Sequence, residues 1–348
     1  MLPWLGEKLV TFFGPFRLFT SYLFLIGLGV LIAAVATWYL LPRFWYLLPR
    51  DRGRAHAVAA RQSVGKPVGV GIFFIPIFVF ACLLVTPFRW YTLEILGCLL
   101  LAAFEGYLDD RNGGWSEYRL ALIDLGIALL GALSICRLTD FTLWLPLFKT
   151  PVTVSPWFFV PLATGLIWIS INATNCTDGV DGLSGSLSLL AFIYLGGLLY
   201  GIVGHQDISQ YLLVPHYPDG AQWAMLAFIM SGCLVGYLWH NALPSTVLMG
   251  DAGSRPIGFL LGVLILSSGN PFLIFVVAGM VLLNGATGLL KVALLRFFKV
   301  GIFKQVRYPL HDHVRQQLGW SNTQVLVRFM LLQAFFTPLL LLLLLKVR

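Results

Sequence analysis

Four short polar motifs carry the residues of this sequence that are able to do chemistry. They are Asp109-Asp110, Asn172 to Gly182, Met249 to Ser254 and His311-Asp312-His313. Carboxylate oxygens are the ligands that Mg²⁺ and Mn²⁺ prefer, and histidine exchanges protons near neutral pH. The sequence around these motifs is almost continuously apolar. Their side chains therefore indicate a site that handles charged oxygen groups.

Five carboxylates come together on one face of the protein if the first three motifs converge. They are Asp109, Asp110, Asp178, Asp181 and Asp251. Their mutual repulsion is costly unless cations offset it, and hard oxygen ligands without a matching cysteine cluster favour Mg²⁺ over zinc. Mg²⁺ binds through one or two carboxylates and completes its shell with water and substrate phosphates. The acids therefore predict an Mg²⁺ cofactor and a phosphate-bearing substrate.

The glycines of the second and third motifs let the backbone turn sharply and approach a ligand, and backbone N–H groups there are able to bind phosphate oxygens. Each Asp-Gly pair alone is equally compatible with an ordinary polar turn. His311 and His313 stand two residues apart and point differently, which favours diphosphate binding or proton handling over a shared helical metal site. An isolated pair is also compatible with solvated histidines at a membrane interface.

The composition is that of a polytopic membrane protein. Of 348 residues, 58% are hydrophobic and 11% are charged, whereas roughly a quarter of the residues of a soluble domain are charged. The net charge of +8 comes with no basic module interleaved with aromatics, so nucleic acid is not an expected partner. The five cysteines form no CxxC motif, so neither a disulfide nor a zinc site is expected. We expect one helical membrane domain over residues 1–348.

Apolar runs of about 20 residues, the length that crosses a bilayer, predict an all-α fold with about ten transmembrane helices. The expected spans are 18–41, 67–87, 91–108, 120–137, 157–174, 184–204, 222–239, 255–269, 271–295 and 326–346. Loops 43–66 and 296–325 are rich in Lys and Arg, whereas loop 205–221 has none. The basic loops fall on one side of the membrane, which should be cytoplasmic.

Every polar motif follows a span that runs from the outside to the inside. Asp109-Asp110 ends the third span, the Asn- and Asp-rich motif ends the fifth, and the other two motifs follow the seventh and the ninth. The spacing therefore predicts an active site on the cytoplasmic face. Glu105 and Asp124 lie near or within spans, where ionisable residues are functional candidates by default. Both are also compatible with an interfacial position, and we leave them outside the predicted site.

The motifs, in this order and at these membrane positions, resemble the polyprenyl-phosphate N-acetylhexosamine-1-phosphate transferase superfamily. The resemblance runs nearly the whole length of the chain, and Asn172 to Gly182 together with Met249-Gly-Asp251-Ala-Gly-Ser254 are its most specific parts. Within the superfamily, the chain looks most like the members that transfer phospho-MurNAc-pentapeptide. The resemblance implies ten transmembrane helices, a cytoplasmic Mg²⁺-dependent site, a bacterial inner-membrane location and a homodimer.

The resemblance also implies the substrates and the residue roles. UDP-MurNAc-pentapeptide is the expected donor, and undecaprenyl phosphate, held among membrane lipid, is the expected acceptor. Asp251 with help from Asp109 or Asp110 is expected to hold Mg²⁺, with Asp110 assigned as the second ligand, and all three acids are assigned as catalytic. Substrate contacts are expected from Asn172, Asn175, Asp178, Asp181, Asn241, His311 and His313.

Three departures from the family pattern touch nucleotide-sugar recognition more than metal–phosphate chemistry. Ser63 stands where a Lys is usual, Leu248 where an aromatic residue is usual, and Asp312 interrupts three consecutive histidines. Two alternatives therefore stay open at this point. One is a sister transferase that uses UDP-GlcNAc or another UDP-sugar, and the other is an ion-coupled transporter or flippase. Against the transporter, the acids gather at one membrane face rather than at the midplane.

Overall fold

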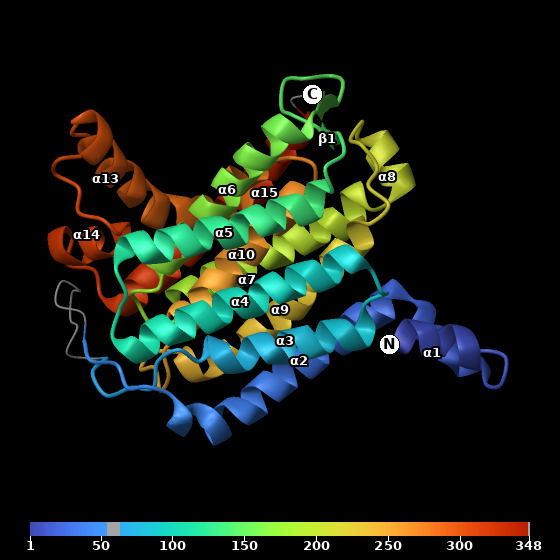
Figure 1. Ribbon diagram of the computed structural model, residues 1–348, viewed down its shortest axis with the longest axis horizontal. Coiled ribbons are helices and arrows are strands. Elements are labelled where there is room, and N and C mark those ends of the chain that lie inside the picture. Colours follow the sequence, from blue (N-terminus) through green and yellow to red (C-terminus); the bar gives the residue numbers. More distant parts are fainter. Residues whose placement is uncertain (54–62, 347–348) are drawn as a thin grey trace.

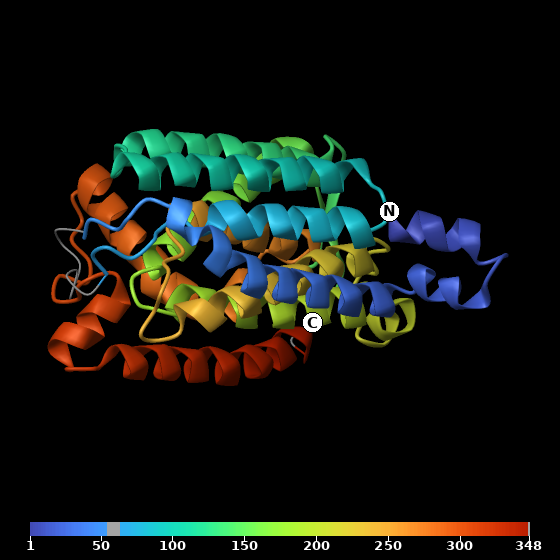
Figure 2. The ribbon, with the colours of Figure 1, turned by 90° about the horizontal axis from the view of Figure 1, so that it is seen from below.

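The computed structural model describes residues 1–53 and 63–346, and its long helices lie side by side along one axis (Figures 1 and 2). These helices are α2 (Tyr22–Phe44), α3 (Gly71–Val85), α4 (Trp90–Asn112), α5 (Glu117–Cys136), α6 (Pro156–Thr177), α7 (Leu183–Leu198), α9 (Gly220–Asn241), α10 (Asp251–Ser267) and α15 (Asn322–Lys346). Helix α13 (Thr287–Phe298) projects from one end of the bundle at an angle to them (Figure 1). Shorter helical segments are α1 (Leu2–Leu9), η1 (Gly14–Thr20), η2 (Trp45–Leu47), η4 (Leu199–Val203), α8 (Gln206–Tyr211), α11 (Leu273–Val277), α12 (Gly279–Val281), η5 (Leu282–Ala286) and α14 (Leu310–Gln317). The prediction of an all-α polytopic membrane protein is confirmed.

Eight helical segments of the described part are long and apolar enough to cross a membrane. They are Tyr22–Leu47, Trp90–Asn112, Glu117–Cys136, Pro156–Thr177, Leu183–Val203, Gly220–Asn241, Gly279–Phe298 and Asn322–Lys346. Helices α3 and α10 coincide with two further predicted spans but have only 15 and 17 residues. The count of ten and the orientation of the chain stay predictions. Arg54 and Arg61 of the predicted basic loop lie outside the described residues.

The span predicted over 271–295 is not one continuous helix. Helix α11 ends before Ala278, and α12, the π-helical turn η5 and α13 carry the chain on to Phe298. Gln333 of α15 accepts from the Met280 amide at 2.8 Å and donates to the carbonyl oxygens of Val276 and Val277 at 3.2 and 3.0 Å. Thr337 donates to the Val276 oxygen at 2.9 Å. The mostly apolar sequence of this span did not reveal the break, because the groups that stabilise it lie on another helix.

Helix α10 lies inside the bundle, and all its residues from Asp251 to Ser267 are buried. Glycines bring neighbouring helices close to its first turn. A Cβ on Gly106 of α4 would overlap the carbonyl group of Asp251, and one on Gly71 of α3 would overlap that of Ala252. Small residues allow helix backbones to approach closely in membrane proteins. The start of α10 is therefore held between α3 and α4.

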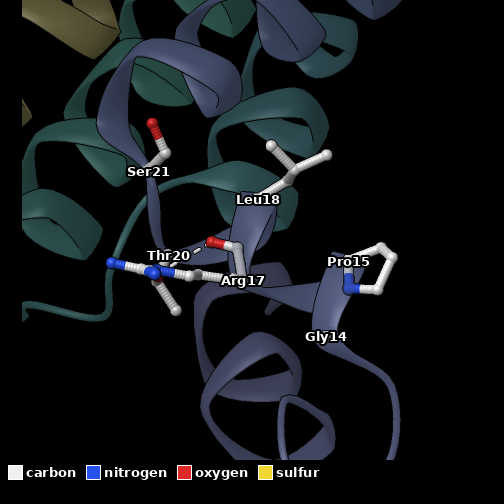
Figure 3. Close-up of a pocket in the computed structure, with 6 residues that line it drawn as sticks. All are labelled: Gly14, Pro15, Arg17, Leu18, Thr20 and Ser21. Atoms are coloured by element: carbon white, nitrogen blue, oxygen red, sulfur yellow. Dashed lines mark hydrogen bonds between the residues drawn. The ribbon is translucent and has the colours of Figure 1, made fainter.

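The two ends of the bundle differ in character. At one end lie the strands β1 (Phe141–Leu143) and β2 (Val152–Val154), which form an antiparallel pair, together with α8. The N-terminal α1 and η1 also extend from this end (Figures 1 and 2). A cavity of about 510 Å³ beside η1 is lined by Gly14, Pro15, Arg17, Leu18, Thr20 and Ser21 (Figure 3). None of the predicted site residues lines it. The helix ends that carry the polar motifs lie at the opposite end, beside α13 and α14.

The close approach of α4 to α10 leads to a prediction about stability. Gly106→Ala adds a methyl group where the backbone of α10 already stands, and such overpacking costs about 1–3 kcal/mol. We expect a lower apparent melting temperature for this variant in detergent. Gly97→Ala on the same helix is the matched control, because a Cβ there meets no other atom within 4 Å. Equal melting temperatures for the two variants would contradict this view of the α4–α10 contact.

Candidate active site

Asp110, at the end of α4, caps the start of α10. Its Oδ1 accepts from the Asp251 amide and its Oδ2 from the Ala252 amide, both at 3.1 Å. The first amides of a helix have no partner within the helix, and the positive end of the helix dipole favours a carboxylate there. Gly250 precedes the helix with a φ of 67°, and a Cβ at this position would overlap Asp110. The sequence pattern predicts only a turn at Gly250. In the structure this glycine also permits the contact between Asp110 and the start of α10.

Asp251 faces Arg255, one turn further along α10. The Nε and Nη2 atoms of Arg255 donate to Oδ2 of Asp251 at 2.9 and 2.8 Å. Arg255 also donates from Nη1 to Oδ2 of Asp124 on α5 at 2.5 Å. Asp251 is only 4% exposed, so the pair lies in surroundings of low dielectric, where charge interactions are strong. Arg255 was not among the predicted site residues, although an arginine inside an apolar span is a signal of function.

Asp109 shapes the turn that follows α4. Its Oδ1 accepts a hydrogen bond from the Trp115 amide, and the Trp115 ring lies under the guanidinium of Arg119 with 3.7 Å between Cζ and the ring centroid. Asp109 is buried, whereas Asp110 is partly exposed. The two acids therefore have different contacts: Asp109 stabilises the loop that follows α4, and Asp110 stabilises the start of α10.

Three asparagines that were predicted to contact substrate connect elements of the protein. Asn175 donates to Oγ of Ser254 at 3.2 Å, which ties the end of α6 to the first turn of α10. Asn172 donates to Oδ2 of Asp124 at 3.4 Å and to its own helix at 3.0 Å. Asn241 accepts from the Gly182 amide at 2.7 Å and donates to the Val247 carbonyl oxygen at 2.7 Å. Asn241 therefore joins the loop after α6 to the loop before α10.

Asp181 and Lys66 form a partly exposed ion pair beside the same two loops. Oδ2 of Asp181 accepts from the Ser245 amide at 3.1 Å and lies 3.4 Å from Nζ of Lys66. Lys66 also donates to Oγ of Ser245 at 2.8 Å. Asp178 stands at the end of α6 and is partly exposed. Sequence reasoning placed Lys66 in the basic loop but missed its contact with Asp181.

His311 is buried at the start of α14, with 2% of its surface exposed. Its backbone N–H and its Nδ1 lie 2.8 and 3.2 Å from Oδ1 of Asn284. Because the backbone group donates, that Asn284 atom is an oxygen, and Nδ1 of the neutral ring carries the proton. Nε2 points to Gly179, where a Cβ would overlap it. His311 therefore packs α14 against the loop that follows α6.

Asp312 gathers two arginines beside His311. Its Oδ1 accepts from Arg315 at 3.3 Å, and its Oδ2 lies 3.8 Å from Arg307. Burial raises the pKa of the Asp312 carboxyl, while the two guanidinium groups oppose this rise. Nδ1 of His313 accepts from the Arg307 amide at 3.3 Å. The segment thus presents two ordered arginines and a half-buried histidine at the end of the bundle that carries the acids.

The carboxylates of this site fit an Mg²⁺ ion that is bound by few protein ligands. Across residues 1–53 and 63–346, no three His, Cys, Asp or Glu side chains form a group that could hold a metal. Mg²⁺ needs only one or two carboxylates, because water and substrate phosphates complete its octahedral shell. Asp251, with Asp110 beside its backbone, supplies hard oxygen donors of this kind. The geometry does not suit a closed metal centre made of protein ligands alone.

The comparisons with known proteins agree with a membrane transferase. The family model described as glycosyl transferase family 4 matches residues 92–269, which include Asp109, Asp110 and Asp251. The class defined by fold and site is therefore a polytopic membrane glycosyl transferase. The phospho-N-acetylmuramoyl-pentapeptide-transferase of Treponema pallidum strain Nichols is 48% identical over 345 residues, which cover 97% of this chain and 94% of that protein.

More distant relatives bear the same name. The protein of Nautilia profundicola is 30% identical over 291 residues, covering 81% of this chain and 82% of its own length. That of Aliarcobacter butzleri is 30% identical over 338 residues, covering 92% and 94%. The chain belongs to the phospho-N-acetylmuramoyl-pentapeptide-transferase family, and the resemblance seen in its motifs is confirmed.

His311 leads to a prediction about pH. Burial, and secondly the charge of Arg315, lowers the pKa of His311 to about 3, against about 6.5 in an unfolded chain. The unfolded state binds more protons between these values, so stability rises with pH in this window. Lowering the pH from 7 to 5 should therefore cost about 2 kcal/mol of unfolding free energy through His311. The measurement is the apparent melting temperature at each pH.

His311→Gln is the control, because it keeps the backbone contact with Asn284 and leaves Asp312 in place. Its melting temperature should fall less between pH 7 and pH 5 than that of the wild type. Parallel pH profiles for the two proteins would show that His311 is not held neutral by the fold.

Proposed function

We propose that this protein transfers phospho-MurNAc-pentapeptide from UDP-MurNAc-pentapeptide to undecaprenyl phosphate, forming lipid I and UMP for peptidoglycan synthesis. The observation that carries the proposal is the 48% identity to a transferase of this name across 97% of the chain. The contacts among Asp110, Asp251 and the loops around them support it, because they join the motifs at one end of the bundle. Family membership also favours an enzyme over a transporter.

The reaction begins when an oxygen of the lipid phosphate attacks the sugar-side phosphorus of the donor diphosphate, and UMP leaves. Asp251 and Asp110 would hold Mg²⁺, which would neutralise the diphosphate and the charge that develops during transfer. Arg307 and Arg315 offer charged donors for phosphate oxygens, and Asp312 orients both of them. Removal of a proton by Asp109 or Asp110 is a minor requirement, because the second pKa of a phosphate monoester is about 6.

The donor contacts proposed for this family fall on the loops around α10. Asp178, Asp181 and His313 are partly exposed at this end and are proposed to touch the nucleotide or the diphosphate directly. Asn172, Asn175, Asn241 and His311 are proposed to act on substrate through the loops that they hold. Lys66 joins the first group, because its amino group lies beside Asp181.

The location of the site follows from the two substrates. The acceptor phosphate lies at the depth of the lipid headgroups, whereas the donor is soluble in water, so the reacting atoms meet only at a membrane surface. We place the multi-pass chain in the bacterial inner membrane with this end facing the cytoplasm, as a single transferase domain over residues 1–348. A homodimer, as the family resemblance implies, completes the proposal.

The first test offers two donors to the purified protein. The detergent-solubilised protein receives undecaprenyl phosphate and Mg²⁺ with either UDP-MurNAc-pentapeptide or UDP-GlcNAc, and UMP and lipid-linked product are measured. We expect turnover of the muramoyl donor only. Turnover of UDP-GlcNAc alone would assign the chain to a sister activity and would point to Ser63, Leu248 and Asp312 as the residues that changed the donor.

The second test concerns Asp251. Asp251→Asn keeps the size of the side chain but removes the charge, and loss of one electrostatic stabiliser lowers kcat about 10²–10³-fold. We expect that loss in the transfer assay with the protein still folded. Asp207→Asn, at an exposed position of α8 near the other end of the bundle, is the matched control and should transfer at the wild-type rate. Normal activity of the Asp251 variant would refute its role as a metal ligand.

A further inference from the structure

A buried ion network extends from Asp251 into the bundle. Arg255 contacts Asp251 through two of its nitrogens and Asp124 through the third. Asp251 and Arg255 belong to α10, whereas Asp124 belongs to α5. The guanidinium thus links the first turn of α10 to a helix that carries none of the predicted site residues.

The network is shielded from water, and Asp124, its member furthest from Asp251, has a further hydrogen-bond partner. Arg255 is 4% exposed and Asp124 is fully buried. Oδ2 of Asp124, which accepts from Arg255, also accepts from Asn172 at 3.4 Å. A buried ion pair is costly unless its geometry is good and further hydrogen bonds satisfy its members. A network of this kind is poor as a stabiliser but well suited to hold a side chain in one orientation.

The charges of the network favour the view that Arg255 positions Asp251 and does not simply neutralise its charge. One guanidinium contacts two carboxylates, those of Asp251 and Asp124. The acids outnumber the cation, so the group remains attractive to a divalent cation even with Arg255 present. Both nitrogens of Arg255 that reach Asp251 donate to the same oxygen, Oδ2, which holds this oxygen at the guanidinium and limits the rotation of the side chain.

We propose that Arg255 is a positioning residue of the transfer reaction: it orients the Asp251 carboxylate toward the divalent cation and the substrate phosphates, and Asp124 holds Arg255 in place. The proposal rests on the proposed function, because Asp251 is a metal ligand only in that function. Groups that hydrogen-bond to a metal ligand set its orientation, and their loss weakens metal binding about 10–100-fold.

The test removes the guanidinium without changing the net charge. The double variant Arg255→Met/Asp124→Asn loses one positive and one negative charge, so the field at Asp251 is nearly conserved while the fork that holds it is lost. Binding of Mn²⁺ to the purified protein is followed by electron paramagnetic resonance, without substrates. We expect binding about 10–100-fold weaker than in the wild type. Unchanged or tighter binding would overturn the proposal.

Two single variants sharpen the result. Arg255→Lys keeps the charge one turn from Asp251 but lacks the paired N–H donors of the guanidinium. Its affinity for Mn²⁺ should therefore lie between those of the wild type and the double variant. Wild-type affinity in Arg255→Lys would show that charge alone suffices, against the proposal. Asp124→Asn leaves the pair on α10 intact and serves if the double variant does not fold. It should weaken Mn²⁺ binding in the same direction, and unchanged affinity would remove Asp124 from the proposal.

Failure of the proposal and failure of the function remain distinguishable. Melting temperatures without metal show whether each variant is folded, and the transfer assay is run on the wild type in parallel. A wild-type protein that binds Mn²⁺ but forms no lipid product contradicts the function alone. A wild-type protein that transfers normally, with Mn²⁺ affinity insensitive to Arg255, contradicts the positioning role alone.

Discussion

The contact between the Asp110 carboxylate and the first two amides of α10 is the constraint on which the rest of the structure depends. Helix α10 is buried along its whole length, so water does not reach the amides at its start. In the interior of a membrane protein, backbone groups without partners cost several kcal/mol each. Asp110 supplies those partners from α4. The same contact places the acidic pair beside Asp251, so the requirement that allows α10 to begin inside the bundle also assembles the candidate site.

The sequence was sufficient to predict the class of fold and the residues at the ends of the helices. Apolar runs mark the spans because a bilayer demands about 20 such residues, and the polar motifs stand out because charged residues are rare between them. The break after α11 was not predicted, because no polar motif marks it. Residues 271–295 are mostly apolar, and the polar groups that satisfy the broken backbone are Gln333 and Thr337, more than fifty residues away.

The partners inside the site could not be predicted from the sequence. The pair formed by Asp251 and Arg255 is visible as a spacing of four on one helix, but Asp124 lies 131 residues from Arg255 in the chain, and only the packing of α5 against the bundle joins them. Asn241 and Asn172 carry side chains suited to substrate, and a motif alone does not reveal that they hydrogen-bond to Gly182 and Asp124. Long-range contacts of this kind follow from the helix arrangement, which local patterns do not encode.

The dependence of the α11–α12 break on α15 has a consequence for biogenesis. Helices of a membrane protein enter the bilayer in the order of synthesis, and α15 follows α11 and α12 in the chain. Until it arrives, the carbonyl groups of Val276 and Val277 and the amide of Met280 lack the Gln333 and Thr337 partners that they have in the finished protein. A continuous helix satisfies those groups internally and is the better state in lipid at that stage. The bend that leads to α13 and α14 is therefore completed only when α15 docks.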